Sequence, residues 1–133
     1  KMNGLDNIVE YKCANVFELL TEMAEKGKSD FDFIILDPPA FTKSRSTVKN
    51  AARGYKEINM KAMKLLPRGG YLATCSCSHF MTDELFRKML HSAAEDAAVQ
   101  LRQIEVRQQG PDHPILWNVP ETDYLKFYIF QIV

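Results

Sequence analysis

The feature of this sequence that most restricts its fold is the apolar run Phe33–Leu36, which ends at Asp37-Pro38-Pro39. An unbroken run of bulky apolar residues is typical of a strand buried on both faces of a parallel sheet. Proline has no backbone N–H, so the two prolines predict that the strand stops there. The run therefore places a carboxylate at the carboxyl end of a central strand, where open α/β sheets bind ligands. Taken alone, Asp37 has two interpretations, a ligand-binding residue or the cap of a turn.

Predicted strands and helices alternate along the rest of the chain. The hydrophobic periodicity, caps and breakers predict strands over residues 7–14, 33–36, 71–76, 101–107 and 125–133, and helices over 15–27, 51–66 and 82–97. Residues 42–50 and 110–123 are predicted loops. This β-α-β-α-β-α-β-β order predicts an α/β fold of Rossmann-like type. We expect a parallel sheet with helices on both faces and an antiparallel hairpin of the last two strands at its edge.

The composition is that of one soluble domain. The chain has 133 residues, of which 46% are hydrophobic, and it contains no apolar run long enough to span a membrane. An odd set of three cysteines without a disulfide pattern predicts free thiols in a reducing compartment, which we take to be the cytoplasm. The three histidines show no metal-ligand spacing, so no metal site is expected.

Basic side chains are concentrated directly after Asp37, although the net charge of the chain is zero. Between residues 38 and 71 the sole acidic residue is Glu57. The basic residues of this segment are Lys43, Arg45, Lys49, Arg53, Lys56, Lys61, Lys64 and Arg68. Such a block attracts phosphate to a neighbouring site, or it forms the solvated face of a loop and helix. Both interpretations stay open on these residues.

Reactive groups follow two consecutive predicted strands, Asp37 after the first and Cys75 and Cys77 at the end of the second. The carboxyl ends of parallel strands meet at one edge of a sheet, so a carboxylate and a thiol are expected over one crevice. This pair suits covalent chemistry on an electrophilic ring. We expect Cys75 to lie on the strand and pack as a small apolar residue, and Cys77 to emerge into the crevice.

Several motifs together resemble one enzyme family. They are Asp37-Pro38-Pro39-Ala40-Phe41, Arg53-Gly54-Tyr55-Lys56-Glu57-Ile58-Asn59, Gly69-Gly70, Ser76-Cys77-Ser78, Asp112-His113-Pro114 and Tyr124-Leu125-Lys126. From about residue 15 to its end, the chain is similar to the RlmI-type large-subunit ribosomal RNA cytosine-C5 methyltransferases. The combination is specific, whereas Asp-Pro-Pro alone is shared by many nucleic-acid methyltransferases.

The resemblance implies a class I methyltransferase fold, with S-adenosylmethionine as the cofactor and ribosomal RNA as the substrate. Cys77 matches the thiol that attacks C6 of the target cytosine, and Asp37 matches the acid that contacts the base near N3 and N4. Asn15 stands where the family usually has an aspartate that contacts the cofactor adenine, and a plain helix cap remains the alternative. Phe41 is expected to stack on the flipped base or the cofactor, or else to pack beneath the loop.

The resemblance thus gives two groups of expected binding residues. For the cofactor they are Asn15, Asp37 and Pro38. For the RNA substrate they are Pro39, Phe41, Lys43, Arg53 and Lys56.

The sequence also departs from the family pattern, because it has no glycine-rich loop after a first strand and no ribose-binding acid after a second. The family's amino-terminal RNA-binding domain is absent too. We therefore expect residues 1–133 to be the carboxyl-terminal part of one methyltransferase domain, inactive alone and with little affinity for the cofactor. The central strand would keep an unpaired edge, which predicts a homodimer or a strand-exchanged oligomer.

Two alternative functions remain. The first is methylation of an exocyclic base amine, in which Asp-Pro-Pro holds the amino group and Cys77 is dispensable. The second is a non-catalytic fragment that binds RNA or a partner, which predicts no cofactor binding even within a longer protein.

Overall fold

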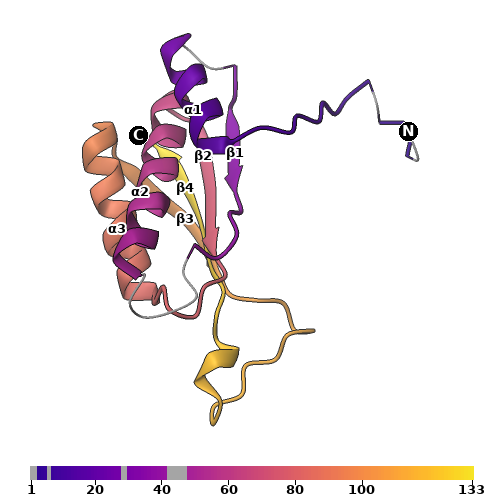
Figure 1. Ribbon diagram of the computed structural model, residues 1–133, viewed down its shortest axis with the longest axis vertical. Coiled ribbons are helices and arrows are strands. Elements are labelled where there is room, and N and C mark those ends of the chain that lie inside the picture. The colour runs from indigo at the N-terminus through magenta and orange to yellow at the C-terminus, as the bar shows by residue number, and fades with distance from the viewer. Residues whose placement is uncertain (1–2, 6, 28–29, 42–47) are drawn as a thin grey trace.

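The chain forms an open α/β sheet, and the computed structural model describes residues 3–5, 7–27, 30–41 and 48–133 (Figure 1). The elements are α1 (Val16–Glu25), β1 (Phe33–Leu36), α2 (Val48–Leu65), β2 (Tyr71–Ser76), α3 (Asp83–Ala97), β3 (Leu101–Arg107), the 3-10 helix η2 (Pro120–Thr122) and β4 (Lys126–Ile132). The predicted bounds of the first three of these strands are confirmed. Helix α2 begins at Val48, earlier than the predicted residue 51.

Side-chain caps begin two of the helices where the sequence predicts them. The side-chain oxygen Oδ1 of Asn15 accepts a hydrogen bond from the backbone N–H of Phe17 at 3.0 Å, which caps α1. The Thr82 hydroxyl oxygen accepts from the backbone N–H of Leu85 at 3.3 Å, which caps α3. Each bond satisfies one of the donors that a helix leaves unpaired at its amino end.

The sheet is mixed, with strand order β1-β2-β4-β3. Strands β1 and β2 are parallel, and Leu36 is paired with Thr74. Strand β4 is antiparallel to both of its neighbours, β2 and β3. The predicted antiparallel pairing of the last two strands is confirmed, but the hairpin does not simply extend the edge. Instead β4 enters the sheet between β2 and β3, so β3 becomes the outer strand.

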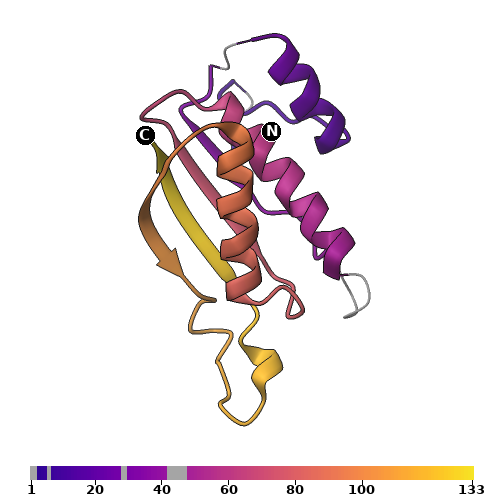
Figure 2. The same cartoon turned by 90° about the vertical axis from the view of Figure 1, so that its left-hand side faces the viewer.

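The three helices cover one face of the sheet, and the expectation of helices on both faces is wrong for the described residues (Figures 1 and 2). The core lies between this face and helices α2 and α3. It includes the fully buried side chains of Tyr55, Met63, Leu72, Phe86 and Tyr128. Helix stripes that are apolar on one side explain this arrangement, because each helix has a single face to bury.

Two expectations about the amino-terminal part of the sheet are also wrong. Strand β1 is not central, because among the described residues it pairs with β2 alone and so forms an edge of the sheet. Residues 7–14 form no strand, and they lead away from the body of the molecule (Figure 1). Their alternating apolar side chains have no described face to cover, and Tyr11 is 91% exposed. A strand needs a paired neighbour to satisfy its backbone groups.

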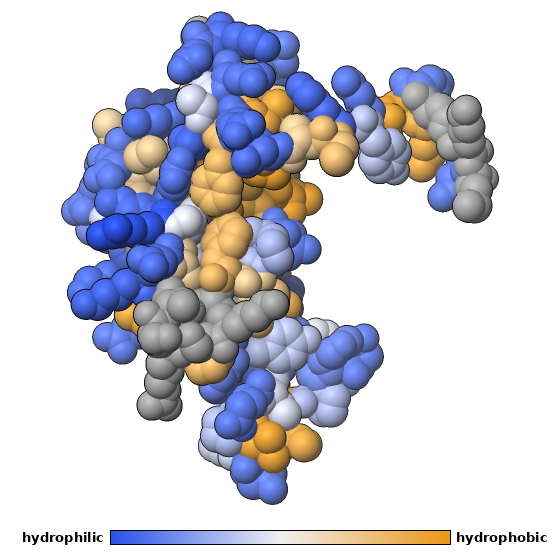
Figure 3. Space-filling view, viewed as in Figure 1, coloured by the Kyte–Doolittle hydropathy of each residue, from blue (hydrophilic) through white to orange (hydrophobic). Residues whose placement is uncertain are grey.

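Strand β1, which forms an edge of the sheet, carries exposed apolar side chains. Phe33 is 47% exposed and Ile35 is 66% exposed. Apolar side chains, drawn in orange, gather beside β1 in the space-filling view (Figure 3). An unpaired apolar strand edge is a template for pairing with another chain. The unpaired edge that the sequence predicts is thus present among the described residues.

We therefore expect the 133-residue chain to self-associate through β1, and Ile35→Lys to weaken this association by placing a charge at the edge. Sedimentation velocity over a concentration series measures the effect. Ile104→Lys, on the opposite edge strand β3, is the matched control, since Ile104 is 50% exposed. A wild-type monomer, or an association that Ile104→Lys weakens and Ile35→Lys does not, would contradict the prediction.

Candidate catalytic site at the carboxyl ends of strands β1 and β2

The parallel pairing of β1 and β2 brings Asp37 and Cys75 into contact. The Cys75 thiol donates a hydrogen bond to the Asp37 carboxylate, with 3.1 Å between Sγ and Oδ1. It also lies 3.5 Å from the carbonyl oxygen of Leu36. The sequence pattern places these residues at one edge of the sheet but does not predict this bond, because local patterns do not give the register of the two strands. Cys75 therefore holds the carboxylate in place besides packing in the sheet.

Cys75 is a poor nucleophile in this position. Burial raises the pKa of its thiol to about 12, and the hydrogen bond and negative charge of Asp37 act in the same direction. The thiolate is the reactive form of cysteine, so such a group is protonated and inert near neutral pH. The expected burial of Cys75 is confirmed.

Cys77 is exposed, in contrast, and it lies in a turn that is fixed on both sides. On one side the buried Ser76 hydroxyl is 3.1 Å from the Tyr55 hydroxyl of α2 and accepts from the backbone N–H of Ser78 at 3.3 Å. On the other side the Lys126 ammonium donates to the Ser78 carbonyl at 2.6 Å. Cys77 is thus exposed just after β2, but it is not among the described residues that line the two cavities at this end of the sheet, so its expected emergence into a crevice stays a prediction.

A cavity of about 510 Å³ lies where the amino end of α1 meets the carboxyl end of β1. Five residues singled out in the sequence line it, namely Asn15, Asp37, Pro38, Pro39 and Phe41. The other lining residues are Val16, Phe17, Ile35, Leu36 and Ile58. The structure thus brings the three expected cofactor residues together with two of the expected substrate residues.

This lining suits the adenosine part of a nucleoside cofactor, because apolar walls surround a few polar groups. The Asn15 side chain caps α1, and its Nδ2 donates to the Glu18 carboxylate at 3.2 Å. An amide nitrogen has two N–H donors, and the bond to Glu18 uses one. The helix-cap interpretation of Asn15 is confirmed, and it leaves one donor for a ligand.

Phe41 forms a wall of this cavity and packs against the helices. Its ring centroid is 4.6 Å from that of Tyr55 and 6.0 Å from that of Phe17. The ring also packs closely against Gly54 of α2, where an added Cβ would be in van der Waals contact with it at 3.4 Å. The Phe41 ring thus packs against the helices and also lines the cavity, while most of the loop beneath which it was expected to pack lies outside the described residues.

The structure does not bring the expected basic residues to this cavity. Arg53 and Lys56 line a separate groove of about 300 Å³ between α2 and α3. The Lys56 ammonium is 2.7 Å from the Asp96 carboxylate of α3, so this charge is already paired. Lys43 lies outside the described residues.

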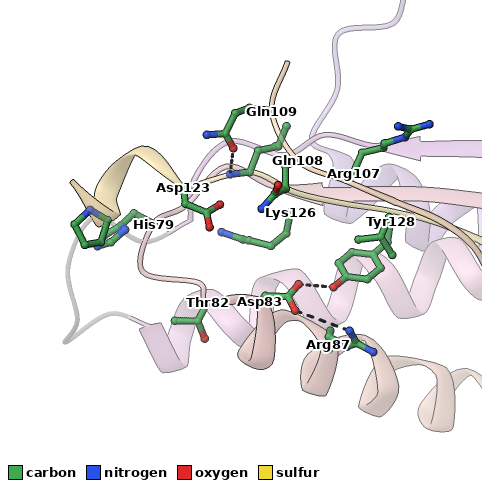
Figure 4. Close-up of a pocket in the computed structure, with 13 residues that line it drawn as sticks. His79, Thr82, Asp83, Arg87, Arg107, Gln108, Gln109, Asp123, Lys126 and Tyr128 are labelled. Carbon is green, nitrogen blue, oxygen red and sulfur yellow. Dashed lines mark hydrogen bonds and ion pairs between the residues drawn. The ribbon is translucent and has the colours of Figure 1, made fainter. Parts of the chain in front are cut away.

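A larger cavity of about 790 Å³ lies at the same end of the sheet, between the start of α3, the end of β3 and the start of β4 (Figure 4). Its polar side chains include Asp83, Asp123 and Lys126. Tyr128 donates a hydrogen bond to Asp83, and burial raises the pKa of Tyr128 to about 12 with help from this partner. The sequence analysis missed this cavity, although Lys126 belongs to one of the motifs that carry the family resemblance.

Two further classes of site are not found in the described part of the chain. No group of three His, Cys, Asp or Glu side chains there is arranged to hold a metal ion. No described helix combines the length and the apolar character that crossing a membrane requires.

The fold is that of S-adenosylmethionine-dependent methyltransferases. A methyltransferase crystallised with SAH, SMU.776, matches 89% of this chain with a TM-score of 0.70 and 18% identity, and the match covers 30% of that protein. A second structure, described as a SAM-dependent methyltransferase from Streptococcus mutans, matches with a TM-score of 0.72 over 89% of this chain and 29% of its own. No family model matches the sequence.

The chain is homologous to ribosomal RNA large subunit methyltransferase I. It is 46% identical over 132 residues to that protein of Shewanella denitrificans, a match that covers 98% of this chain and 33% of the relative. It is 42% identical over 134 residues to those of Erwinia tasmaniensis and Klebsiella pneumoniae, with 100% of this chain covered. The chain therefore spans about a third of the length of the curated relatives it matches.

The difference between the two thiols predicts selective alkylation. In the folded chain at pH 8 we expect iodoacetamide to modify Cys77 at least about 100-fold faster than Cys75, whose pKa of about 12 keeps it protonated. Peptide mass spectrometry over a time course measures both rates. Unfolding in guanidinium should make the rates similar. Comparable rates in the folded chain would show that Cys75 is not protected.

Proposed function

We propose that this chain is part of an S-adenosylmethionine-dependent methyltransferase that modifies C5 of a cytosine in large-subunit ribosomal RNA, with Cys77 as the nucleophile. The observation that carries the proposal is the exposed Cys77 thiol just after β2, two residues beyond Cys75, whose own thiol is bonded to the Asp37 carboxylate at the end of β1. The homology to ribosomal RNA large subunit methyltransferase I supports both the reaction class and the substrate.

In the proposed mechanism the Cys77 thiolate adds to C6 of the cytosine. This addition makes C5 nucleophilic, so that C5 would accept the methyl group of a cofactor held by Asn15, Asp37 and Pro38. A base removes the C5 proton, the double bond forms again, and Cys77 leaves as a thiolate. The bound cofactor supplies an electrophilic methyl group, and its by-product is a neutral thioether.

Asp37 is proposed to hold the ring while this takes place. A carboxylate near N3 and N4 of cytosine hydrogen-bonds the amino group and stabilises a protonated N3, which makes C6 more electrophilic. The Cys75 thiol donates to one oxygen of the Asp37 carboxylate, Oδ1. The second oxygen, Oδ2, is proposed to accept the hydrogen bond from the cytosine. Cys75 is thus proposed to position the Asp37 carboxylate, and it can do so as a buried, protonated thiol.

The cavity of about 510 Å³ is the proposed cofactor site. Asn15 would hydrogen-bond the adenine, and Asp37 and Pro38 would line the side nearest the reacting base. Pro39 and Phe41 would form the boundary between cofactor and substrate. Since the 133 residues contain neither a glycine-rich phosphate loop nor a matching ribose-binding acid, we expect weak cofactor binding by this chain alone.

The RNA would approach along the basic segment after Pro39. Arg53 is exposed on α2, while Lys56 is paired with Asp96 and would have to exchange that partner for a phosphate. Lys43 is proposed as a further phosphate contact on sequence grounds. Phosphate contacts of this kind position the RNA without reading its sequence.

The nucleophile can be tested in a chimaera in which this chain replaces the matching 132 residues of the Shewanella denitrificans relative. RNA that carries 5-fluorocytosine should form a covalent adduct with the chimaera, because fluorine at C5 cannot leave as a proton does. Cys77→Ala should abolish the adduct, which denaturing electrophoresis detects. Cys75→Ala and Cys13→Ala are the controls. An adduct that survives Cys77→Ala and is lost with Cys75→Ala would refute the assignment.

The same experiment separates the alternative chemistry. If Cys77→Ala keeps full methylation and the product carries its methyl group on the exocyclic nitrogen, the enzyme is an amine methyltransferase. Mass spectrometry of the digested RNA distinguishes the two products.

The role of Asp37 predicts that Asp37→Asn in this chimaera lowers kcat about 10²–10⁴-fold, with a much smaller change in cofactor affinity. The reason is that the carboxylate acts on the reacting base. Single-turnover methylation and cofactor titration measure the two quantities. Asp32→Asn is the matched control, since Asp32 is exposed just before β1. A near-normal kcat for Asp37→Asn would exclude the role.

A further inference from the structure

Lys126 is a charged residue in an unusual place, because its side chain is almost fully buried at the start of β4. It is 8% exposed, and burying an ammonium group is costly unless it is paired. Its Nζ donates to the carbonyl oxygens of Ser78 at 2.6 Å and Tyr124 at 2.7 Å. Two carbonyl groups satisfy two of the three ammonium donors but do not neutralise the charge. The structure therefore maintains a positive charge here at a cost in stability.

The titratable acidic groups that interact with Lys126 come from three different segments. Burial lowers the pKa of Lys126, whereas the negative charges of Cys77, Asp123 and Asp83 act in the opposite direction. Asp83 is already bonded to Tyr128. Figure 4 shows the Lys126 side chain reaching into the cavity with its nitrogen toward Asp123.

We propose that Lys126 is a positioning residue for Cys77, which holds the 76–78 turn through the Ser78 carbonyl and places a positive charge beside the thiol. The inference rests on the proposed function in treating Cys77 as the nucleophile, whereas its test measures only the reactivity of the thiol.

The geometry favours this role because the turn is fixed at both ends around an exposed residue. The Ser76 hydroxyl is bonded to Tyr55 of α2, and the Ser78 carbonyl is bonded to Lys126 of β4. Cys77 lies between these two anchors, so its direction is set by two different elements of the fold. An apolar residue at position 126 would fill the space at lower cost but would provide neither the bond nor the charge.

The charge near the thiol has a direct chemical consequence. A neighbouring cation favours the thiolate, which is the form that attacks an electrophile. Two further titratable groups that interact with Cys77 are Tyr55 of α2 and Cys75 of β2. Burial raises the pKa of both, so both are neutral at pH 7 to 8. Lys126 is a charged neighbour of Cys77, so removing its charge should alter the reactivity of the thiol.

The test uses the 133-residue chain itself and needs neither RNA nor cofactor. The rate of alkylation by iodoacetamide is measured for each cysteine from pH 6 to 10 by peptide mass spectrometry. Cys13 is exposed and serves as the internal reference thiol in every sample. Lys126→Gln removes the charge and keeps an N–H donor for the Ser78 carbonyl. Lys126→Arg keeps the charge, and Lys88→Gln makes the same change at an exposed position of α3.

We expect Lys126→Gln to shift the alkylation profile of Cys77 to higher pH and to lower its rate at pH 7.5 about tenfold. The profile of Cys13 should not move, and Lys88→Gln should leave both thiols unchanged. Lys126→Arg should restore most of the rate. A folded Lys126→Gln variant with the wild-type Cys77 profile would overturn the proposal, as would an equal shift with Lys88→Gln.

A second variant keeps the test decisive if Lys126→Gln does not fold. Asp123 is exposed and faces the ammonium, so Asp123→Asn should be tolerated. It should shift the Cys77 profile to lower pH, because the charge of Lys126 is then less compensated. An unchanged profile in this variant would contradict the proposal. The outcome is independent of the adduct experiment with RNA, which tests the proposed reaction.

Discussion

The register between β1 and β2 is the constraint on which the rest of the site depends. Pairing of Leu36 with Thr74 places the residues that come next in the chain, Asp37 after β1 and Cys75 within β2, side by side. A shift by one residue would turn Cys75 toward the opposite face of the sheet and would separate it from the carboxylate. Helix α2 then completes the arrangement, because Tyr55 reaches the next residue of the same strand, Ser76. The site is therefore a consequence of one strand pairing and one helix packed across it.

Much of this fold could be predicted from the sequence, since its local signals are strong. The apolar run before Asp37, the caps at Asn15 and Thr82, and the alternation of strands and helices gave elements that the structure confirms. Local signals do not report which neighbour a strand pairs with. For that reason the sequence suggested a strand over residues 7–14 and a central position for β1, and the structure has neither.

The candidate site was predictable in its members but not in its contacts. The end of β1 is followed by Asp37, Pro38 and Pro39. Because of this position the three residues line the cavity between β1 and the amino end of α1. The bond from Cys75 to Asp37 and the burial of Lys126 depend on residues far apart in the chain, so no local pattern reveals them. Arg53 and Lys56 show the converse. They belong to a basic segment next to the site, yet the rotation of α2 directs them toward α3.

Gly54 has a consequence for how the proposed cofactor cavity evolves. The ring of Phe41 rests against the bare backbone of α2, with room for little more than a methyl group at position 54. Any larger side chain there would push the ring toward the cavity of about 510 Å³ and narrow it from behind. The width of the cavity thus depends on α2, although Ile58 is the only described residue of this helix that lines the cavity. Selection on ligand size can therefore act at a residue that never touches the ligand.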